Sequence, residues 1–107
     1  MRGLENVGRE GVMAYSAAKA AVISFTKTLA KELAPGVRVN CVSPGLIASP
    51  KQLARPAKII EELLDASLIA RWIQPEEIAH AFIYLAEADA VTGENLVVDG
   101  GFSLKLE

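Results

Sequence analysis

The sequence predicts an α/β fold in which helices alternate with the strands of a parallel sheet. A helical pattern over residues 12–33 is followed, after a two-residue turn, by a β-branched segment at residues 37–42. A helix connected so closely to a strand is typical of a β-α-β unit, whose strands are parallel. About three helices and two strands are expected in total. Two parallel strands have open edges, so the pattern indicates one side of a larger sheet.

The first predicted helix covers residues 12–33. Residues 1–11 contain three glycines and several charges, which predicts a loop. Beyond them no Pro or Gly interrupts the pattern, and apolar residues recur at helical spacing: Val22, Phe25, Leu29 and Leu33. Pro35 and Gly36 are expected to end the helix.

Residues 37–42 predict a strand because apolar and polar residues alternate and valine is frequent. We expect the strand to end at the turn Ser43-Pro44-Gly45. Asn40 is expected to make structural hydrogen bonds and to have no catalytic role. Cys41 is expected to be a small buried residue.

The segment from Leu46 to Gln74 begins with two helix-breaking prolines, Pro50 and Pro56. Residues 57–68 then predict an amphipathic helix. Its apolar side carries Ile60, Leu63 and Leu64, and its solvated side carries Glu61, Glu62 and Asp65.

A further helix is predicted over residues 75–87, because Pro75 suits its first turn and Glu76 and Glu77 favour the positive end of its dipole. We expect it to bury Ile78, Phe82, Ile83 and Leu85. Residues 92–93 then turn the chain into a second strand at residues 95–99, which Gly100 and Gly101 close.

The composition indicates a soluble globular protein. Of the 107 residues 51% are hydrophobic and 22% charged, and the net charge is −2, with no basic cluster for nucleic acid or membrane. A single cysteine cannot form an intrachain disulfide, which favours an intracellular, cytoplasmic protein. The first residues resemble no secretory signal, and no apolar run is long enough to span a membrane.

Tyr15 and Lys19 are the candidate catalytic residues. Four residues apart on a helix, they share one face. A Lys ammonium stabilises a phenolate, which lowers the pKa of the Tyr from its usual value of about 10. Such a phenol can protonate a carbonyl oxygen or deprotonate an alcohol. Taken alone, the pair also suits an ordinary solvated helix face.

Four motifs, which occur one after another along the chain, decide between these alternatives. They are YSAAKAAV at residues 15–22, VRVNCVSPG at residues 37–45, PEEIA at residues 75–79 and TGENLVVDGG at residues 92–101. Together they resemble the short-chain dehydrogenase/reductase family, from just before its Tyr-x-x-x-Lys helix to its last strand. The resemblance implies the C-terminal part of a Rossmann-like doubly wound parallel sheet, with residues 1–107 as a single partial domain.

The family resemblance also implies an NAD(P)-dependent oxidoreductase that interconverts a carbonyl and a secondary alcohol. Tyr15 would be the general acid/base, and both Tyr15 and Lys19 would contact the cofactor, with Lys19 binding the nicotinamide ribose. Pro44 and Gly45 would shape the loop against the nicotinamide ring. The backbone of Ile47 would bind the carboxamide, and Ser49 stands where the family usually has a Thr that contacts the nicotinamide or phosphate.

Two parts of the family's apparatus are missing from these residues. No strand, glycine-rich turn and helix precede Tyr15, since Gly3, Gly8 and Gly11 lack that context. The catalytic Ser that the family carries before the Tyr is also absent, and Ser16 points elsewhere. We therefore expect Met1 to be an internal residue of a longer parent protein, and the chain alone to be inactive.

Some residues keep two interpretations. Ile69, Trp72 and Ile73 could line a substrate pocket or simply pack. Arg55 and Lys58 could attract an anionic substrate or remain solvated. His80 has no Cys or acidic cluster around it at ligand spacing, so no metal site is expected.

The alternative to an enzyme is a non-catalytic assembly module, an oligomerising fragment, or a decayed member of the family. In this family the active-site helix and the last helix and strand usually form subunit interfaces. Apolar residues suited to such contacts are Val22, Phe25, Leu29 and Phe82. We therefore expect a homo-oligomer, or association with a missing N-terminal half.

Overall fold

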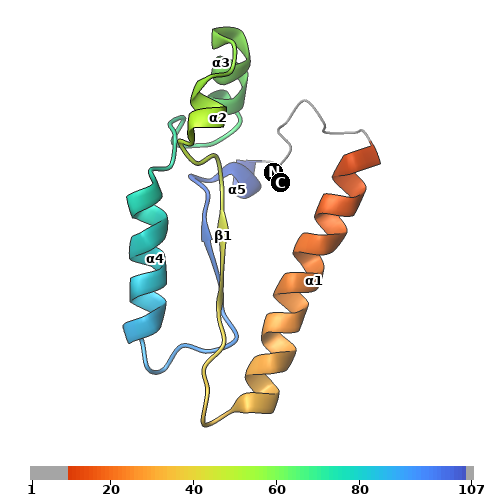
Figure 1. Ribbon diagram of the computed structural model, residues 1–107, viewed down its shortest axis with the longest axis vertical. Coiled ribbons are helices and arrows are strands. Elements are labelled where there is room, and N and C mark those ends of the chain that lie inside the picture. The colour runs from red at the N-terminus through yellow and green to blue at the C-terminus, as the bar shows by residue number, and fades with distance from the viewer. Residues whose placement is uncertain (1–9, 106–107) are drawn as a thin grey trace. The chain divides into compact units, whose positions relative to one another are not determined.

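The computed structural model describes residues 10–105, with side chains from Ala17 onward, and contains five helices and two strands there (Figure 1). In chain order they are α1 (Glu10–Leu33), β1 (Cys41–Pro44), α2 (Pro50–Leu53), α3 (Ala57–Asp65), α4 (Pro75–Glu87), β2 (Asn95–Val98) and α5 (Phe102–Lys105). The predicted α/β class is confirmed. Two four-residue helices, α2 and α5, accompany the three predicted ones.

The chain divides into two units, described here one at a time. The first extends through Cys41 and includes Ala90–Asn95, and the second contains Val42–Asp89 and the residues from Leu96 onward. The expectation of a single partial domain over residues 1–107 stays a prediction. None of the helices within residues 10–105 has the length and apolarity needed to cross a bilayer.

In the first unit, α1 presents small side chains to its neighbours. Thr26 and Ala30 are buried, and the Thr26 hydroxyl donates to the Val22 carbonyl at 2.8 Å. A Cβ on Gly93 would lie 3.6 Å from the Ala30 Cβ, so the 90–95 segment comes close to the helix. Residues 10 and 11, predicted as loop, belong to α1, and the earlier part of that loop lies outside the described residues. The helix ends at Leu33, as predicted.

The prediction of a strand at residues 37–42 is wrong in its bounds. Residues 37–40 precede β1, and hydrogen bonds to a loop and to side chains fix residues 39 and 40. The Val39 N–H donates to the Thr92 hydroxyl at 3.1 Å, and its carbonyl accepts from Gly93 N–H at 2.7 Å. Asn40 donates to the Val91 carbonyl at 3.0 Å and accepts from Glu94 N–H at 3.0 Å. The predicted structural role of Asn40 is thus confirmed, but just before the strand.

The two strands form a parallel pair. Cys41 N–H donates to the Glu94 carbonyl at 2.9 Å and Gly45 N–H to the Val98 carbonyl at 3.0 Å, so both strands advance in the same direction. Alternate N–H groups of a strand point to one side, which directs the Pro44 nitrogen away from β2. A proline at this position therefore removes no hydrogen bond of the pair, and β1 continues through Ser43 and Pro44 where a turn was predicted.

In the second unit, Figure 1 shows α4 alongside the two strands. The buried hydrophobic residues of this unit are Leu46, Leu63, Ile73, Ala81 and Leu85. Leu63 belongs to the predicted apolar side of α3, and the acidic residues predicted to be solvated are exposed. Helix α3 ends at Asp65, three residues before its predicted end. There the buried Ser67 hydroxyl donates to the Leu64 carbonyl at 3.3 Å and accepts from Ala70 N–H at 3.2 Å, closing a turn.

Helix α4 has its predicted bounds, but the prediction that it buries Phe82 and Ile83 is wrong. These side chains are 57% and 52% exposed, whereas Leu85 is 6% exposed. The inward stripe passes through Ile78, Ala81 and Leu85, which are three and four residues apart. Phe82 lies at the edge of that stripe, about 100° around the helix from the buried Ala81.

Candidate functional site

Tyr15 and Lys19 both lie within the continuous helix α1, one helical turn apart. The backbone therefore provides the spacing that places both residues on one face. Lys19 is half-buried. The side chains of Tyr15 and Ser16 lie outside those that the structure describes.

The second unit contains Pro44, Gly45, Ile47 and Ser49 within one short segment at the carboxyl end of β1. Ligands of open α/β sheets bind beyond the carboxyl ends of the strands. Pro44 is exposed and ends β1. A Cβ on Gly45 would lie 2.7 Å from the Asp99 Cα and 3.0 Å from its carbonyl oxygen, so glycine allows the ends of β1 and β2 to approach closely.

Ile47 forms a parallel bridge with Ile73. The bridge consists of Ile73 N–H to the Leu46 carbonyl at 2.8 Å and Ala48 N–H to the Ile73 carbonyl at 2.9 Å. In such a bridge the N–H and C=O of the central residue, Ile47, point away from the partner strand. The Ile47 carbonyl accepts from Ser49 N–H at 2.8 Å. The Ile47 N–H thus faces away from Ile73, as a backbone donor to a ligand must.

Ser49 is the N-cap of α2. Its hydroxyl oxygen accepts from Gln52 N–H at 3.3 Å, and Pro50 occupies the first turn of the helix. A hydroxyl that accepts one hydrogen bond still has its O–H to donate. The capping role therefore leaves Ser49 able to donate to an amide or phosphate oxygen.

Asp99 follows β2 and holds the turn into α5. Its Oδ1 accepts from Gly101 N–H at 2.9 Å and its Oδ2 from Ser103 N–H at 3.0 Å. Burial raises the pKa of this carboxyl, but the hydrogen bonds from Ser103, Gly101 and Phe102 outweigh burial and lower the pKa below its ordinary value. The prediction that Asp99 ends the strand is wrong, because its side chain caps the turn instead.

Gly100 and Gly101 have positive φ angles of 61° and 83°. Side chains at these positions would collide with Ile69 and Leu68, respectively, at distances of 2.6 and 2.7 Å. Ile69 N–H also donates to the Gly100 carbonyl at 3.0 Å, and Lys105 Nζ donates to the Asp65 carbonyl. The glycine pair is therefore a contact surface for the segment after α3.

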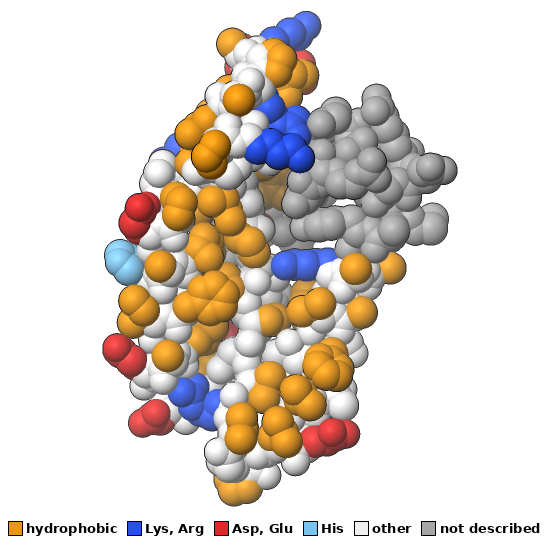
Figure 2. All heavy atoms as spheres, in the orientation of Figure 1, with side chains coloured by type: hydrophobic (Ala, Val, Ile, Leu, Met, Phe, Trp, Pro, Cys, Tyr) orange, Lys and Arg blue, Asp and Glu red, His pale blue; other side chains and the backbone are white. Residues whose placement is uncertain are grey.

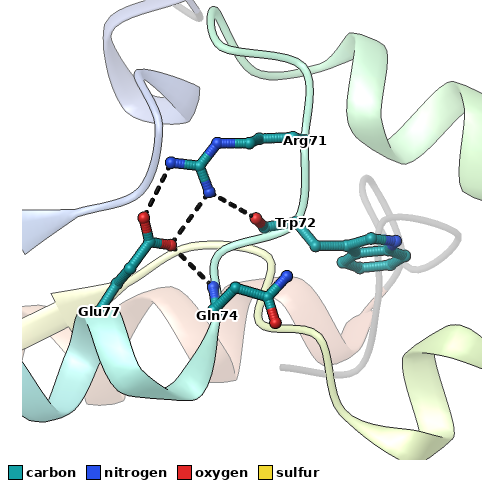
Figure 3. A network of polar contacts seen from close by, with 4 residues as sticks. All are labelled: Arg71, Trp72, Gln74 and Glu77. Carbon is teal, nitrogen blue, oxygen red and sulfur yellow. Dashed lines mark hydrogen bonds and ion pairs between the residues drawn. The ribbon is translucent and has the colours of Figure 1, made fainter.

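Sequence reasoning missed the ion pair between Arg71 and Glu77 (Figure 3). Arg71 Nη2 lies 2.8 Å from Glu77 Oε1 and Nη1 lies 3.0 Å from Oε2. Hydrogen bonds from Arg71, then from the Gln74 backbone, lower the pKa of Glu77 to about 2, and the pKa of Arg71 is raised by the same hydrogen bond. The only sequence sign was an Arg shortly before the acidic first turn of α4.

The remaining candidates have simpler surroundings. Ile73 is buried, which favours packing, whereas Trp72 is half-buried and Ile69 is 49% exposed. Arg55 is half-buried, and Lys58 and His80 are exposed. Cys41 is half-buried, not buried as expected, and its Sγ lies 3.4 Å from Asn95 Oδ1. Among the described residues no group of three or more His, Cys, Asp or Glu is placed to hold a metal ion.

Comparison with known proteins gives matches along nearly the whole chain. The family model described as enoyl-(acyl carrier protein) reductase matches residues 3–103. A cyclopentanol dehydrogenase of Comamonas sp. (strain NCIMB 9872) is 44% identical over 102 residues, which cover 91% of this chain and 41% of that protein. A 3-oxoacyl-[acyl-carrier-protein] reductase of Synechocystis sp. is 48% identical over 99 residues, covering 89% and 39%.

A solved structure of 4-hydroxyisoleucine dehydrogenase complexed with NADH superposes with a TM-score of 0.79 at 31% identity. The match covers 86% of this chain and 40% of that one. The chain thus spans about two fifths of the length of the relatives that it matches.

Proposed function

The chain belongs to the short-chain dehydrogenase/reductase family, and from that membership we propose that it contributes to an NAD(P)-dependent oxidoreductase of the relatives' full length. The reaction is the interconversion of a carbonyl compound and a secondary alcohol. The observation that carries the proposal is the pair Tyr15 and Lys19, one turn apart within α1.

In this proposal Tyr15 moves the proton. During reduction the phenol gives its proton to the carbonyl oxygen, and during oxidation the phenolate takes the proton of the alcohol. Lys19 stabilises the phenolate by its positive charge and binds the ribose. A bound nicotinamide cofactor supplies or accepts the hydride.

The segment after β1 has a donor set that fits such a cofactor, NAD or NADP. The Ile47 N–H points away from Ile73 and can donate to the carboxamide, and the Ser49 O–H can donate to the carboxamide or a phosphate. Gly45 and Pro44 shape the backbone before them. The site lies at the carboxyl end of the parallel strands, where ligands bind in such sheets.

We also propose that these 107 residues alone do not turn over substrate. The sequence before Tyr15 has no glycine-rich motif of the kind that binds the cofactor phosphates, and no Ser in the family's position. Nicotinamide-dependent turnover by the purified 107-residue chain, free of host reductases, would contradict this part of the proposal.

The proposal is tested by Tyr15→Phe in the protein of full length, assayed with NADH and NADPH against a panel of ketones and secondary alcohols. Removing the phenolic proton donor should lower kcat by at least about a hundredfold, while the cofactor Kd should change far less. The matched control is Tyr84→Phe, because Tyr84 is a 56% exposed residue of α4. Equal activities of wild type and Tyr15→Phe would refute the role of Tyr15.

Exposed apolar residues favour a second candidate function, a non-catalytic assembly module. Val22 is 53% exposed, Phe25 64% and Phe82 57%, and Figure 2 shows apolar side chains at the surface over α4. Light scattering of the wild-type chain and the variants Phe25→Ser and Phe82→Ser tests it, with Leu53→Ser as the control for another exposed apolar residue. A wild-type monomer at all concentrations would exclude assembly.

A further inference from the structure

The two peptide groups on either side of Ile73 are each held at both ends. In the Trp72–Ile73 peptide, the carbonyl accepts from Arg71 Nη1 at 2.9 Å and the N–H donates to the Leu46 carbonyl at 2.8 Å. In the Ile73–Gln74 peptide, the N–H donates to Glu77 Oε2 at 2.8 Å and the carbonyl accepts from Ala48 N–H at 2.9 Å.

A trans peptide is planar, and its C=O and N–H point in opposite directions. Each of these groups therefore extends from the Arg71–Glu77 ion pair on one side to the Leu46–Ala48 segment on the other. Loss of the ion pair would therefore release one end of each peptide group that forms the bridge between Ile73 and Ile47.

The geometry of the ion pair suits orientation more than stability. Two parallel hydrogen bonds join the guanidinium to the carboxylate, and Figure 3 shows the same guanidinium reaching the Trp72 carbonyl. The Arg71 and Glu77 side chains are 54% and 36% exposed, so the pair adds little to the free energy of folding. Planar, two-point contact nevertheless defines a direction, which a single ammonium contact does not.

We infer that Arg71 and Glu77 are positioning residues, which hold Ile73 and through it set the orientation of the Ile47 backbone toward the nicotinamide. The inference rests on the proposed function, in which the Ile47 N–H meets the cofactor. Neither side chain has to touch the cofactor, because the effect passes through two peptide groups.

The test compares Arg71→Gln, Arg71→Lys and the control Glu76→Gln in the full-length protein. Glu76 is an exposed carboxylate of the same first turn of α4. Amide hydrogen exchange is measured at Ala48 and Ile73, with Leu85 as the reporter of global opening. The dissociation constants for NADH and NADPH are measured by direct titration of the same samples.

In Arg71→Gln, exchange at Ala48 and Ile73 should become about threefold to fivefold faster, and the Kd of the preferred dinucleotide should rise by a similar factor. Exchange at Leu85 should stay constant. Arg71→Lys should change the exchange rates and the Kd less than Arg71→Gln does, because lysine keeps the positive charge but lacks the paired N–H donors of the guanidinium. Glu76→Gln should change neither quantity.

Unchanged exchange at Ala48 and Ile73 would overturn the inference. It would also be overturned if exchange at Leu85 became faster by the same factor, because the whole protein would then be opening. Faster exchange at the two sites with an unchanged Kd would also overturn it, since the bridge would then not orient the cofactor. Wild-type protein that binds neither dinucleotide would instead refute the proposed function, while the exchange comparison would still decide whether the ion pair supports the bridge.

Discussion

Gly45 and Asp99 approach so closely that a Cβ on Gly45 would lie 2.7 Å from the Asp99 Cα and 2.8 Å from its Cβ. The contact joins the carboxyl end of β1 to the residue that follows β2. The sequence interpretation gave Gly45 the role of admitting the nicotinamide ring. The structure adds a reason within the protein itself, because the backbone of Asp99 occupies the space of a side chain.

Gly45→Ala is therefore expected to destabilise the protein. The added methyl group meets backbone atoms, which cannot move aside as the end of a side chain can, and overpacking of this kind costs about 1–3 kcal/mol. Urea unfolding measures the difference. Gly36→Ala is the matched control, since its Cβ would meet only the Leu33 carbonyl oxygen at 3.8 Å, and it should be close to neutral.

Asp99→Asn should destabilise the turn between β2 and α5 by about 1 kcal/mol. An amide presents one acceptor oxygen where the carboxylate accepts from both Gly101 and Ser103. The pKa of Asp99 is lowered in the folded state, so its contribution is present above the unfolded pKa and is lost as the pH falls through the folded value. The unfolding free energies of the wild type and Asp99→Asn should therefore converge as the pH falls, and urea unfolding at several pH values measures this.

Glu77 should titrate with a midpoint of about 2, where its ordinary value is 4.5. A depressed folded pKa means that the carboxylate stabilises the protein above pH 4.5 and loses this effect as the pH falls toward 2. Carboxyl NMR shifts give the midpoint directly. A midpoint near 4.5 would show that the Arg71 contact is absent in solution.

Ser49→Ala and Ser49→Thr separate the hydroxyl from the rest of the side chain. Alanine removes the acceptor for Gln52 N–H, which should cost about 0.5–1 kcal/mol, and also removes the donor proposed for the cofactor. Threonine keeps both functions and should bind the cofactor as the wild type does. A Kd that is equal in all three proteins would remove Ser49 from the proposed cofactor site.

Two residues of α4 should respond very differently to truncation. Leu85→Ala removes a side chain that is 6% exposed and should cost about 2–5 kcal/mol. Phe82→Ser changes a side chain that is 57% exposed, and its effect on the stability of the single chain should stay within about 0.5 kcal/mol. Thermal unfolding at low concentration compares them, and a large loss in Phe82→Ser would show that this side chain is covered in solution.

Local sequence patterns determined most of the secondary structure and the family. The start of α4 follows from Pro75 and its acidic first turn, and the end of α1 follows from Pro35 and Gly36. These features act within one or two turns of chain, so neighbouring residues suffice to predict them. The pairing of Tyr15 with Lys19 is equally local, because helical periodicity alone places them on one face.

Only the tertiary structure decided which residues meet across the sequence. The start of β1 at Cys41, the exposure of Phe82, and the contact of Gly45 with Asp99 all depend on partners distant in the chain. The peptide groups around Ile73 are the clearest case, since they join Arg71 and Glu77 to Leu46 and Ala48 through backbone hydrogen bonds. Every residue except proline offers the same backbone donor and acceptor, so the residue type does not indicate such a link in advance, and only folding selects the partner.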